Sequence, residues 1–266
     1  MVSFVPTEYS NIAIDKDNFL YATTTTYGGG DIGDGGKIKP IRKLNTLGED
    51  VLIRNGYVDP MGDFYWGDGG DISGPSRLED VTAMDNDTYF AIDRVRGRVF
   101  GYDFQGNLLY AFGGIGNKKG YFLYPVAIEH LGTDLLVLDN RSAALTRFTL
   151  TEYGKKISEG LSSYKEGRYE ESADYWKQVL RLNGNYDLAY IGIGRSLLRQ
   201  GEYKEAMKYF EMKRDTDNYS KAFMEYRKQW VEENIGWMIG GFVVLLFLPR
   251  LIKLIKKLIR GGAHKS

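Results

Sequence analysis

Few side chains in this sequence have the chemistry of a catalytic nucleophile or base. The 266 residues include two histidines, His130 and His264, and no cysteine. The lack of cysteine excludes disulfides, thiolate nucleophiles and cysteine-ligated metals. No glycine-rich phosphate loop precedes a helix, and no nucleophile elbow is present. His130 is expected in a solvated turn between strands and His264 in a basic tail, so the sequence predicts no catalytic residue.

Two segments rich in glycine and aspartate, residues 28–36 and 66–74, are candidates for a calcium site. Calcium prefers oxygen ligands from Asp side chains and backbone carbonyls on flexible loops. The spacing does not match an EF-hand, and glycine with aspartate is also common in ordinary turns. Turns are therefore the favoured interpretation. No cofactor is expected, and calcium bound at these segments is the less favoured alternative.

Charge is distributed unevenly along the chain. Lys and Arg number 35, as do Asp and Glu. Six of the basic residues follow Pro249 with no acidic residue among them, which leaves a net charge of −6 on the rest of the chain. An acidic body argues against nucleic acid as the partner, because binding to phosphates requires concentrated Lys and Arg.

The apolar segment 235–252 has the length of one transmembrane helix. At a rise of 1.5 Å per residue it spans roughly 27 Å, close to the thickness of a bilayer core. Trp237 near one end and a cationic cluster at the other are typical of a membrane span. A buried helix of a soluble protein is the less favoured alternative. The cations expected at the membrane surface are Arg250, Lys253, Lys256, Lys257 and Arg260.

The flanking charges predict the orientation of this span. Lys and Arg stay preferentially on the cytoplasmic side, so residues 1–234 are expected outside the cell and the basic tail, 253–266, inside it along the inner leaflet. Export requires an N-terminal signal with a basic stretch and an apolar core. Residues 1–11 contain neither. We therefore expect either that the chain is N-terminally truncated, which we favour, or that this orientation is wrong.

The strands must come from residues 1–152, which are rich in Gly, Asp, Tyr and Thr. Three segments, beginning at Ile12, Val81 and Val126, alternate apolar residues between Gly, Asp and Asn turns, as antiparallel strands do. The clearest segment predicts strands at 81–84, 88–92, 98–102 and 107–112.

These three segments resemble the blades of NHL-repeat β-propellers. The matching residues of the clearest copy are Asp93, Arg98, Tyr102, Asp103 and Gly106, followed by a linker at 112–125. The third copy keeps Asp139 but has Ala144 in place of the arginine. The first copy has Thr23 or Thr24 in place of the aspartate and an insertion at 27–36. Since propellers have about four to eight blades, we expect residues absent from this chain to complete the ring.

The resemblance also implies an enzymatic alternative. Some similar propellers are lactonases that hold a metal in the central channel through Glu, Asn and Asp. Asp93, Asp139 and Asn140 lie at strand ends that could face such a channel. In NHL repeats this aspartate generally has a structural role at the blade edge, which is the favoured interpretation here.

Residues 153–220 repeat with a period of 34 and resemble two tetratricopeptide repeats. Small residues let the two helices of each hairpin approach closely, and aromatic residues fill the gap to the next hairpin. The packing residues are Gly160, Gly167, Tyr169, Trp176, Gly194, Gly201, Tyr203, Ala206 and Phe210. Residues 221–234 are expected to form a helix that caps the stack and leads into the membrane. Such arrays bind proteins or peptides, while a stiff spacer is the alternative.

The predicted architecture is a multi-domain β and α protein: a partial NHL-like β-propeller, a tetratricopeptide-repeat α-solenoid and one C-terminal transmembrane helix. This arrangement resembles a family of cell-surface proteins of Gram-positive bacteria, often encoded near carbohydrate ABC transporters and sometimes labelled gluconolactonase. We expect a membrane-anchored extracellular scaffold for a protein or glycan partner. A metal-dependent, lactonase-like hydrolase is the alternative.

Overall fold

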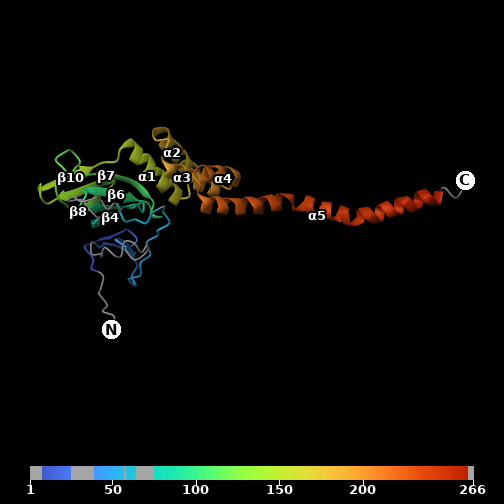
Figure 1. Ribbon diagram of the computed structural model, residues 1–266, viewed down its shortest axis with the longest axis horizontal. Helices are drawn as coiled ribbons and strands as arrows, with labels where there is room; N and C mark the ends of the chain where they lie inside the picture. The colour runs from blue at the N-terminus through green and yellow to red at the C-terminus, as the bar shows by residue number, and fades with distance from the viewer. Residues whose placement is uncertain (1–7, 25–38, 57, 64–74, 263–266) are drawn as a thin grey trace. The chain divides into compact units, whose positions relative to one another are not determined.

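The computed structural model describes residues 8–24, 39–56, 58–63 and 75–262, with side chains as far as Lys253 (Figure 1). The chain divides into two compact units, residues 1–162 and residues 163–266. The first unit contains the strands, and the second contains most of the helices. The sequence predicts this boundary ten residues earlier, close to where the first helix begins.

The described strands of the first unit form three antiparallel sheets, each made of strands that follow one another in the chain. The first sheet contains β1 (Asn11–Ile14), β2 (Leu20–Thr23) and β3 (Ile41–Leu44). The second contains β4 (Leu78–Ala83), β5 (Tyr89–Asp93), β6 (Arg98–Tyr102) and β7 (Leu108–Gly113). The third contains β8 (Pro125–Leu131), β9 (Asp134–Asp139) and β10 (Ala144–Phe148).

Each of the three predicted β-segments therefore forms one sheet, and each sheet follows the up-and-down order of a propeller blade. Short turns join successive strands of the second and third sheets. Gly132 between β8 and β9 and Gly106 between β6 and β7 have φ values of +62° and +84°, which a residue without a Cβ adopts at little cost. In the described residues the fold is thus propeller-like, with three blade-like sheets.

The sheets stack face to face, and each neighbouring pair encloses a core. Full burial of one aromatic or aliphatic side chain contributes about 1.5–3 kcal/mol, so these two cores hold the stack together. The core shared by the first and second sheets includes Tyr21, Ile41, Val81, Tyr89 and Phe100. The core shared by the second and third sheets includes Phe90, Ile92, Val99, Phe122, Ile128 and Val137.

Five helices follow the sheets in the described chain. They are α1 (Glu152–Lys165), α2 (Tyr169–Leu182), α3 (Asp187–Gln200), α4 (Tyr203–Met212) and α5 (Thr216–Gly262). Helix α1 begins in the first unit and ends in the second. In the second unit α2, α3 and α4 each pack against the next helix in the chain.

Helix α5 is 47 residues long and contains three segments that the sequence separates: the capping helix, the span and the start of the tail. Near its beginning Ala222 is completely buried in the core of the helical unit. Farther along, the most apolar 18-residue window of α5 is wholly exposed. Among the described residues, α5 is the one helix long and apolar enough to cross a membrane.

Candidate functional site

The aspartates of the predicted blade motif lie at equivalent places in two sheets. Asp93 ends β5 and accepts hydrogen bonds from the Ser76 hydroxyl at 2.6 Å and the Val95 N–H at 2.8 Å. Asp139 ends β9 and accepts hydrogen bonds from the N–H groups of Leu123 at 2.5 Å and Arg141 at 3.0 Å. Each carboxylate thus ties the turn after its strand to the segment that precedes the first strand of its sheet.

These bonds define the role that the two carboxylates can have. Burial raises the pKa of Asp139, but the backbone N–H groups of Ser142, Leu123 and Tyr124 outweigh burial, and the pKa lies below its usual value. Asp93 is completely buried. Oxygen atoms already used by backbone donors are poor metal ligands, and the geometry gives Asp93 and Asp139 a structural role. Asn140, the third candidate for the channel, is exposed.

The other motif residues shape the second sheet. Asp103 is buried and accepts hydrogen bonds from the N–H groups of Gln105 and Asn107, both at 2.9 Å, within the turn before β7. At Gly106 an added Cβ would lie 2.8 Å from a backbone oxygen of Ile53, so the chain passes too closely there for any side chain. Arg98 forms an ion pair with Asp63 at 2.9 Å. None of these contacts has the form of a ligand site.

The prediction that His130 lies in a turn is wrong. His130 belongs to β8, where it pairs with Leu135. Its Nδ1 atom lies 2.8 Å from the Thr82 hydroxyl and 3.0 Å from Glu129 Oε1. The same hydroxyl is 2.7 Å from Glu129 Oε1, and the three side chains thus form one polar cluster between β4 and β8.

A buried carboxyl, Asp80, belongs to the same region and was missed at the level of sequence. It accepts hydrogen bonds from the Ile128 N–H at 2.7 Å and the Val81 N–H at 2.8 Å. Burial raises its pKa to about 6, with a smaller contribution from the charge of Glu129. The described residues contain no group of three carboxylates or histidines able to hold a metal. Asp80 and Thr82, which lie at alternate positions with apolar residues in β4, were the available signal in the sequence.

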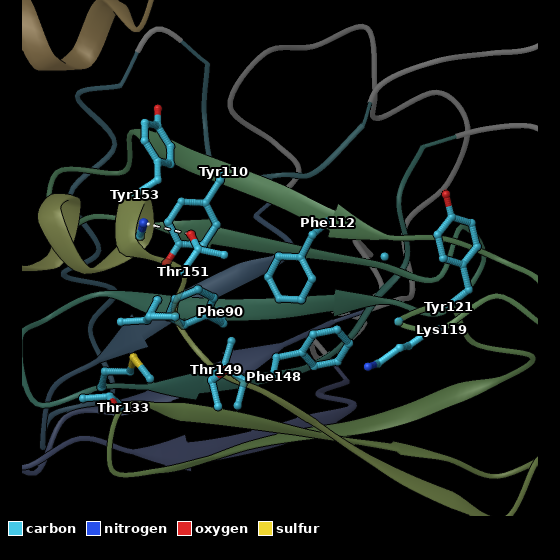
Figure 2. Close-up of a pocket in the computed structure, with 16 residues that line it drawn as sticks. Phe90, Tyr110, Phe112, Lys119, Tyr121, Thr133, Phe148, Thr149, Thr151 and Tyr153 are labelled. Carbon is cyan, nitrogen blue, oxygen red and sulfur yellow. Dashed lines mark hydrogen bonds between the residues drawn. The ribbon is translucent and has the colours of Figure 1, made fainter. Parts of the chain in front are cut away.

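An apolar pocket between the second and third sheets is the strongest candidate for a binding site (Figure 2). It encloses about 460 Å³, within the range of small-ligand pockets. Strands β5, β7, β9 and β10, the loop before β8 and the first turn of α1 contribute its walls. The side chains that define it are Phe90, Tyr110, Phe112, Leu135, Phe148 and Tyr153.

The aromatic rings of the pocket pack against one another. The rings of Phe112 and Phe148 lie 4.9 Å apart, and those of Phe90 and Tyr110 lie 6.0 Å apart. Burial raises the pKa of Tyr110 to about 12, so its hydroxyl stays protonated. Lys119 is the one charged residue among the described lining, and Figure 2 shows it at the side of the pocket opposite α1. The pocket suits apolar or aromatic groups, and no single sequence motif marks it.

The second unit brings together several of the residues predicted to pack its helices. At Gly194 in α3 an added Cβ would lie 2.6 Å from the ring of Phe210 in α4. At Gly192, which was not predicted, it would lie 2.5 Å from the ring of Trp176 in α2. Ala206 is completely buried in α4. Small residues thus let the helices approach at these points.

The remaining predicted packing residues lie at helix ends or in the first unit. Gly167 and Gly201 follow α1 and α3 with φ values of +80° and +85°, as helix-ending glycines do. Tyr169 and Tyr203 begin α2 and α4. Gly160 is buried in α1.

Some predicted residues lie where little is described. Arg250 and Lys253 are exposed on α5. Lys256, Lys257 and Arg260 also belong to α5, but their side chains are outside the described residues. The two Gly/Asp-rich segments, 28–36 and 66–74, lie outside them as well.

No protein-family model and no curated protein matches this chain. Solved structures that match part of it include virginiamycin B lyase from Staphylococcus aureus, with 14% identity and a TM-score of 0.31 over 56% of this chain and 44% of that chain. The PQQ-bound aldose sugar dehydrogenase from Streptomyces coelicolor matches with 16% identity and a TM-score of 0.32, over 53% of this chain and 45% of that chain. Both have β-propeller folds. The chain thus spans less than half the length of either protein, and its propeller-like assignment rests on its own sheets.

Proposed function

We propose that this chain is a membrane-anchored binding protein that presents its sheets and helices to a protein partner outside the cell. The observation that carries the proposal is the continuity of α5. One helix runs from Ala222, buried in the helical unit, to an apolar segment whose residues are all exposed in the described part of the chain. An exposed apolar segment of this length is costly in water, because its side chains contact the solvent, and is stable in a bilayer.

The contents of the apolar segment support the membrane assignment. Trp237, Phe242 and Leu245 are 85%, 63% and 68% exposed. Glu232 and Glu233 precede the segment, Arg250 lies near its C-terminal end, and Lys253, Lys256, Lys257 and Arg260 follow it. Under the positive-inside rule this asymmetry favours a cytoplasmic C-terminus.

The helical unit supports a binding role. Its 34-residue period and the close approach at Gly194, one period after Gly160, are typical of tetratricopeptide repeats. We assign α1 to α4 to two such repeats, with the start of α5 as the cap. Repeats of this kind offer a surface to peptides or proteins rather than a closed catalytic site.

We assign the three sheets to NHL-like blades, with the paired positions of Asp93 and Asp139 as the supporting observation. A lactonase would need those carboxylates for a metal, whereas both hold backbone N–H groups. Binding is therefore better supported than hydrolysis.

Extraction of membranes with alkaline carbonate tests the proposal. The full chain should stay in the membrane pellet. A variant with Val244→Arg and Leu246→Arg should be released, because each arginine near the middle of a span costs about 2.5–3.5 kcal/mol. Exposed Ser142, in the first unit, supplies the matched control Ser142→Arg, which should stay in the pellet. Release of the unmodified chain by carbonate would overturn the proposal.

A further inference from the structure

The second and third sheets differ in one strand. Both begin with three consecutive antiparallel strands, and in both an aspartate ends the second strand, Asp93 in β5 and Asp139 in β9. In the second sheet β7 follows as a fourth strand and pairs with β6 from Arg98↔Gly113 to Tyr102↔Leu108. In the third sheet the described chain continues from β10 into α1. The position next to β10 that corresponds to β7 is not filled by a described strand.

The aromatic pocket lies beside this position. Phe148, the last residue of β10, lies against Phe112 of β7, and Tyr110 adjoins Phe112 with ring centres 6.4 Å apart. All three rings line the pocket and are only partly buried. A fourth strand on the third sheet would extend its face toward β7 and cover these rings. Figure 2 shows Tyr110 and Phe112 above and Phe148 with Thr149 below, all among the residues that line the pocket.

The free edge of β10 is suited to pairing. Its register with β9 is unbroken from Ala144↔Asp139 to Phe148↔Leu135, without the irregularity found between β8 and β9. It contains no proline and no lysine, two features that commonly protect edge strands. Its one charged side chain, Arg147, is held by an ion pair with Asp134.

We propose that the β10 edge and the adjoining pocket bind an extended peptide segment of a partner protein as the fourth strand of the third sheet. Main-chain hydrogen bonds would fix the segment on β10, and its side chains nearest Phe148, the β10 residue that lines the pocket, would enter the pocket. Five residues of β10 span roughly 17 Å, so a segment paired along it would have two or three side chains on the face that includes Phe148. The partner's chemistry is therefore an extended segment with apolar residues at alternate positions.

This inference rests on the proposed binding role, but its test does not depend on the membrane anchor. The probes are three fluorescent peptides of sequence KTXTXTXTK, with X as Leu, Val or Phe, titrated against the full chain in detergent micelles. At least one should bind with a Kd below about 100 μM. A peptide with the same side chains but N-methylated at every second backbone nitrogen should bind at least tenfold more weakly, because it cannot pair along one edge.

Two variants of the chain locate the binding site. Thr149 is exposed at the pocket, so Thr149→Trp fills the pocket without disturbing the core and should weaken binding at least tenfold. Ser142→Trp, in the exposed turn after β9, is the matched control and should change the affinity less than twofold.

Four outcomes would overturn the inference. They are no binding by any of the three peptides at 1 mM, equal binding of the N-methylated peptide, equal binding to the Thr149→Trp variant, and a dimer of the chain that Thr149→Trp dissociates. The last result would assign the edge to a second copy of the chain. Failure of carbonate extraction would leave the peptide result standing, so the two proposals are distinguishable.

Discussion

The substitution Gly194→Ala tests whether α3 and α4 need a residue without a side chain at their contact. The new Cβ would lie 2.6 Å from Phe210, whereas an ordinary contact begins at 3.4 Å, so the ring must move by 0.8 Å. Phe210 is completely buried, and its neighbours must move with it. Overpacking of this kind costs about 1–3 kcal/mol. The higher helix propensity of alanine offsets about 0.5–1 kcal/mol of this loss of stability.

The expected net loss is about 1–2 kcal/mol, which corresponds to a factor of roughly 5–30 in an opening equilibrium. Hydrogen exchange with mass spectrometry, on the full chain in detergent, measures this opening in α3 and α4. Phe210→Leu provides the matched background, since a smaller side chain leaves room for the new methyl group. Gly194→Ala should cost less in that background.

An increase in the protection of α3 after Gly194→Ala would refute this reasoning, because helix propensity alone would then explain the result. An equal loss with and without Phe210 would also contradict it, since the ring is the group that the added methyl meets.

Three further predictions concern the sheets, each followed by hydrogen exchange of their amides. The raised pKa of Asp80 means that the folded state binds the proton of this carboxyl more tightly than the unfolded state does. The free energy of unfolding should therefore fall by roughly 3 kcal/mol as the pH rises from about 4 to about 6. The substitution Asp80→Asn should remove this pH dependence. The lowered pKa of Asp139 acts in the opposite sense: the ionised carboxylate stabilises the folded state fully above the ordinary pKa of 3.8, and this stabilisation is lost on further acidification. The substitution Asp139→Asn should lower the free energy of unfolding by about 2–3 kcal/mol at pH 7. The Tyr89 hydroxyl is buried without a hydrogen-bond partner among the described residues, so Tyr89→Phe should be neutral or stabilise by about 1 kcal/mol. The Asp80 prediction is contradicted if Asp80→Asn leaves the pH dependence of stability unchanged. The Asp139 prediction is contradicted if Asp139→Asn leaves the stability unaffected. The Tyr89 prediction is contradicted if Tyr89→Phe lowers the free energy of unfolding by more than about 1 kcal/mol.

Local features of the sheets could be read from the sequence because they depend on neighbouring residues. Alternating apolar residues and turn glycines placed the four strands of the second sheet, which the structure has at Leu78–Ala83, Tyr89–Asp93, Arg98–Tyr102 and Leu108–Gly113. Alternation is a property of a few consecutive residues, so one sequence contains enough information to place such strands.

The polar cluster and the pocket could not be read in this way. His130 meets Thr82 across 48 positions of the chain, and Phe112 meets Phe148 across 36. These contacts exist only because whole sheets stack on one another. The error over His130 had a local cause, since its position just before Leu131 and Gly132 resembles the start of a turn, whereas β8 continues to Leu131.

The helical unit shows the same distinction. The 34-residue period indicated Gly194, because its partner Gly160 lies one repeat earlier. Gly192 has no such partner, as the residue 34 positions earlier is Ser158, although its contact with Trp176 is equally close. Repetition along the chain therefore revealed one of the two contacts, and three-dimensional packing was needed for the other.

Labelling of single-cysteine variants most directly tests the claim that the chain is anchored with its sheets and helices outside the cell. The natural chain has no cysteine, so Ser142→Cys in the turn after β9 and Ser266→Cys at the C-terminus each introduce one thiol. In intact cells that naturally produce the protein, a membrane-impermeant maleimide should label Ser142→Cys and should label Ser266→Cys only after the cells are opened. Labelling of Ser266→Cys in intact cells, or of neither variant until the cells are opened, would contradict the account.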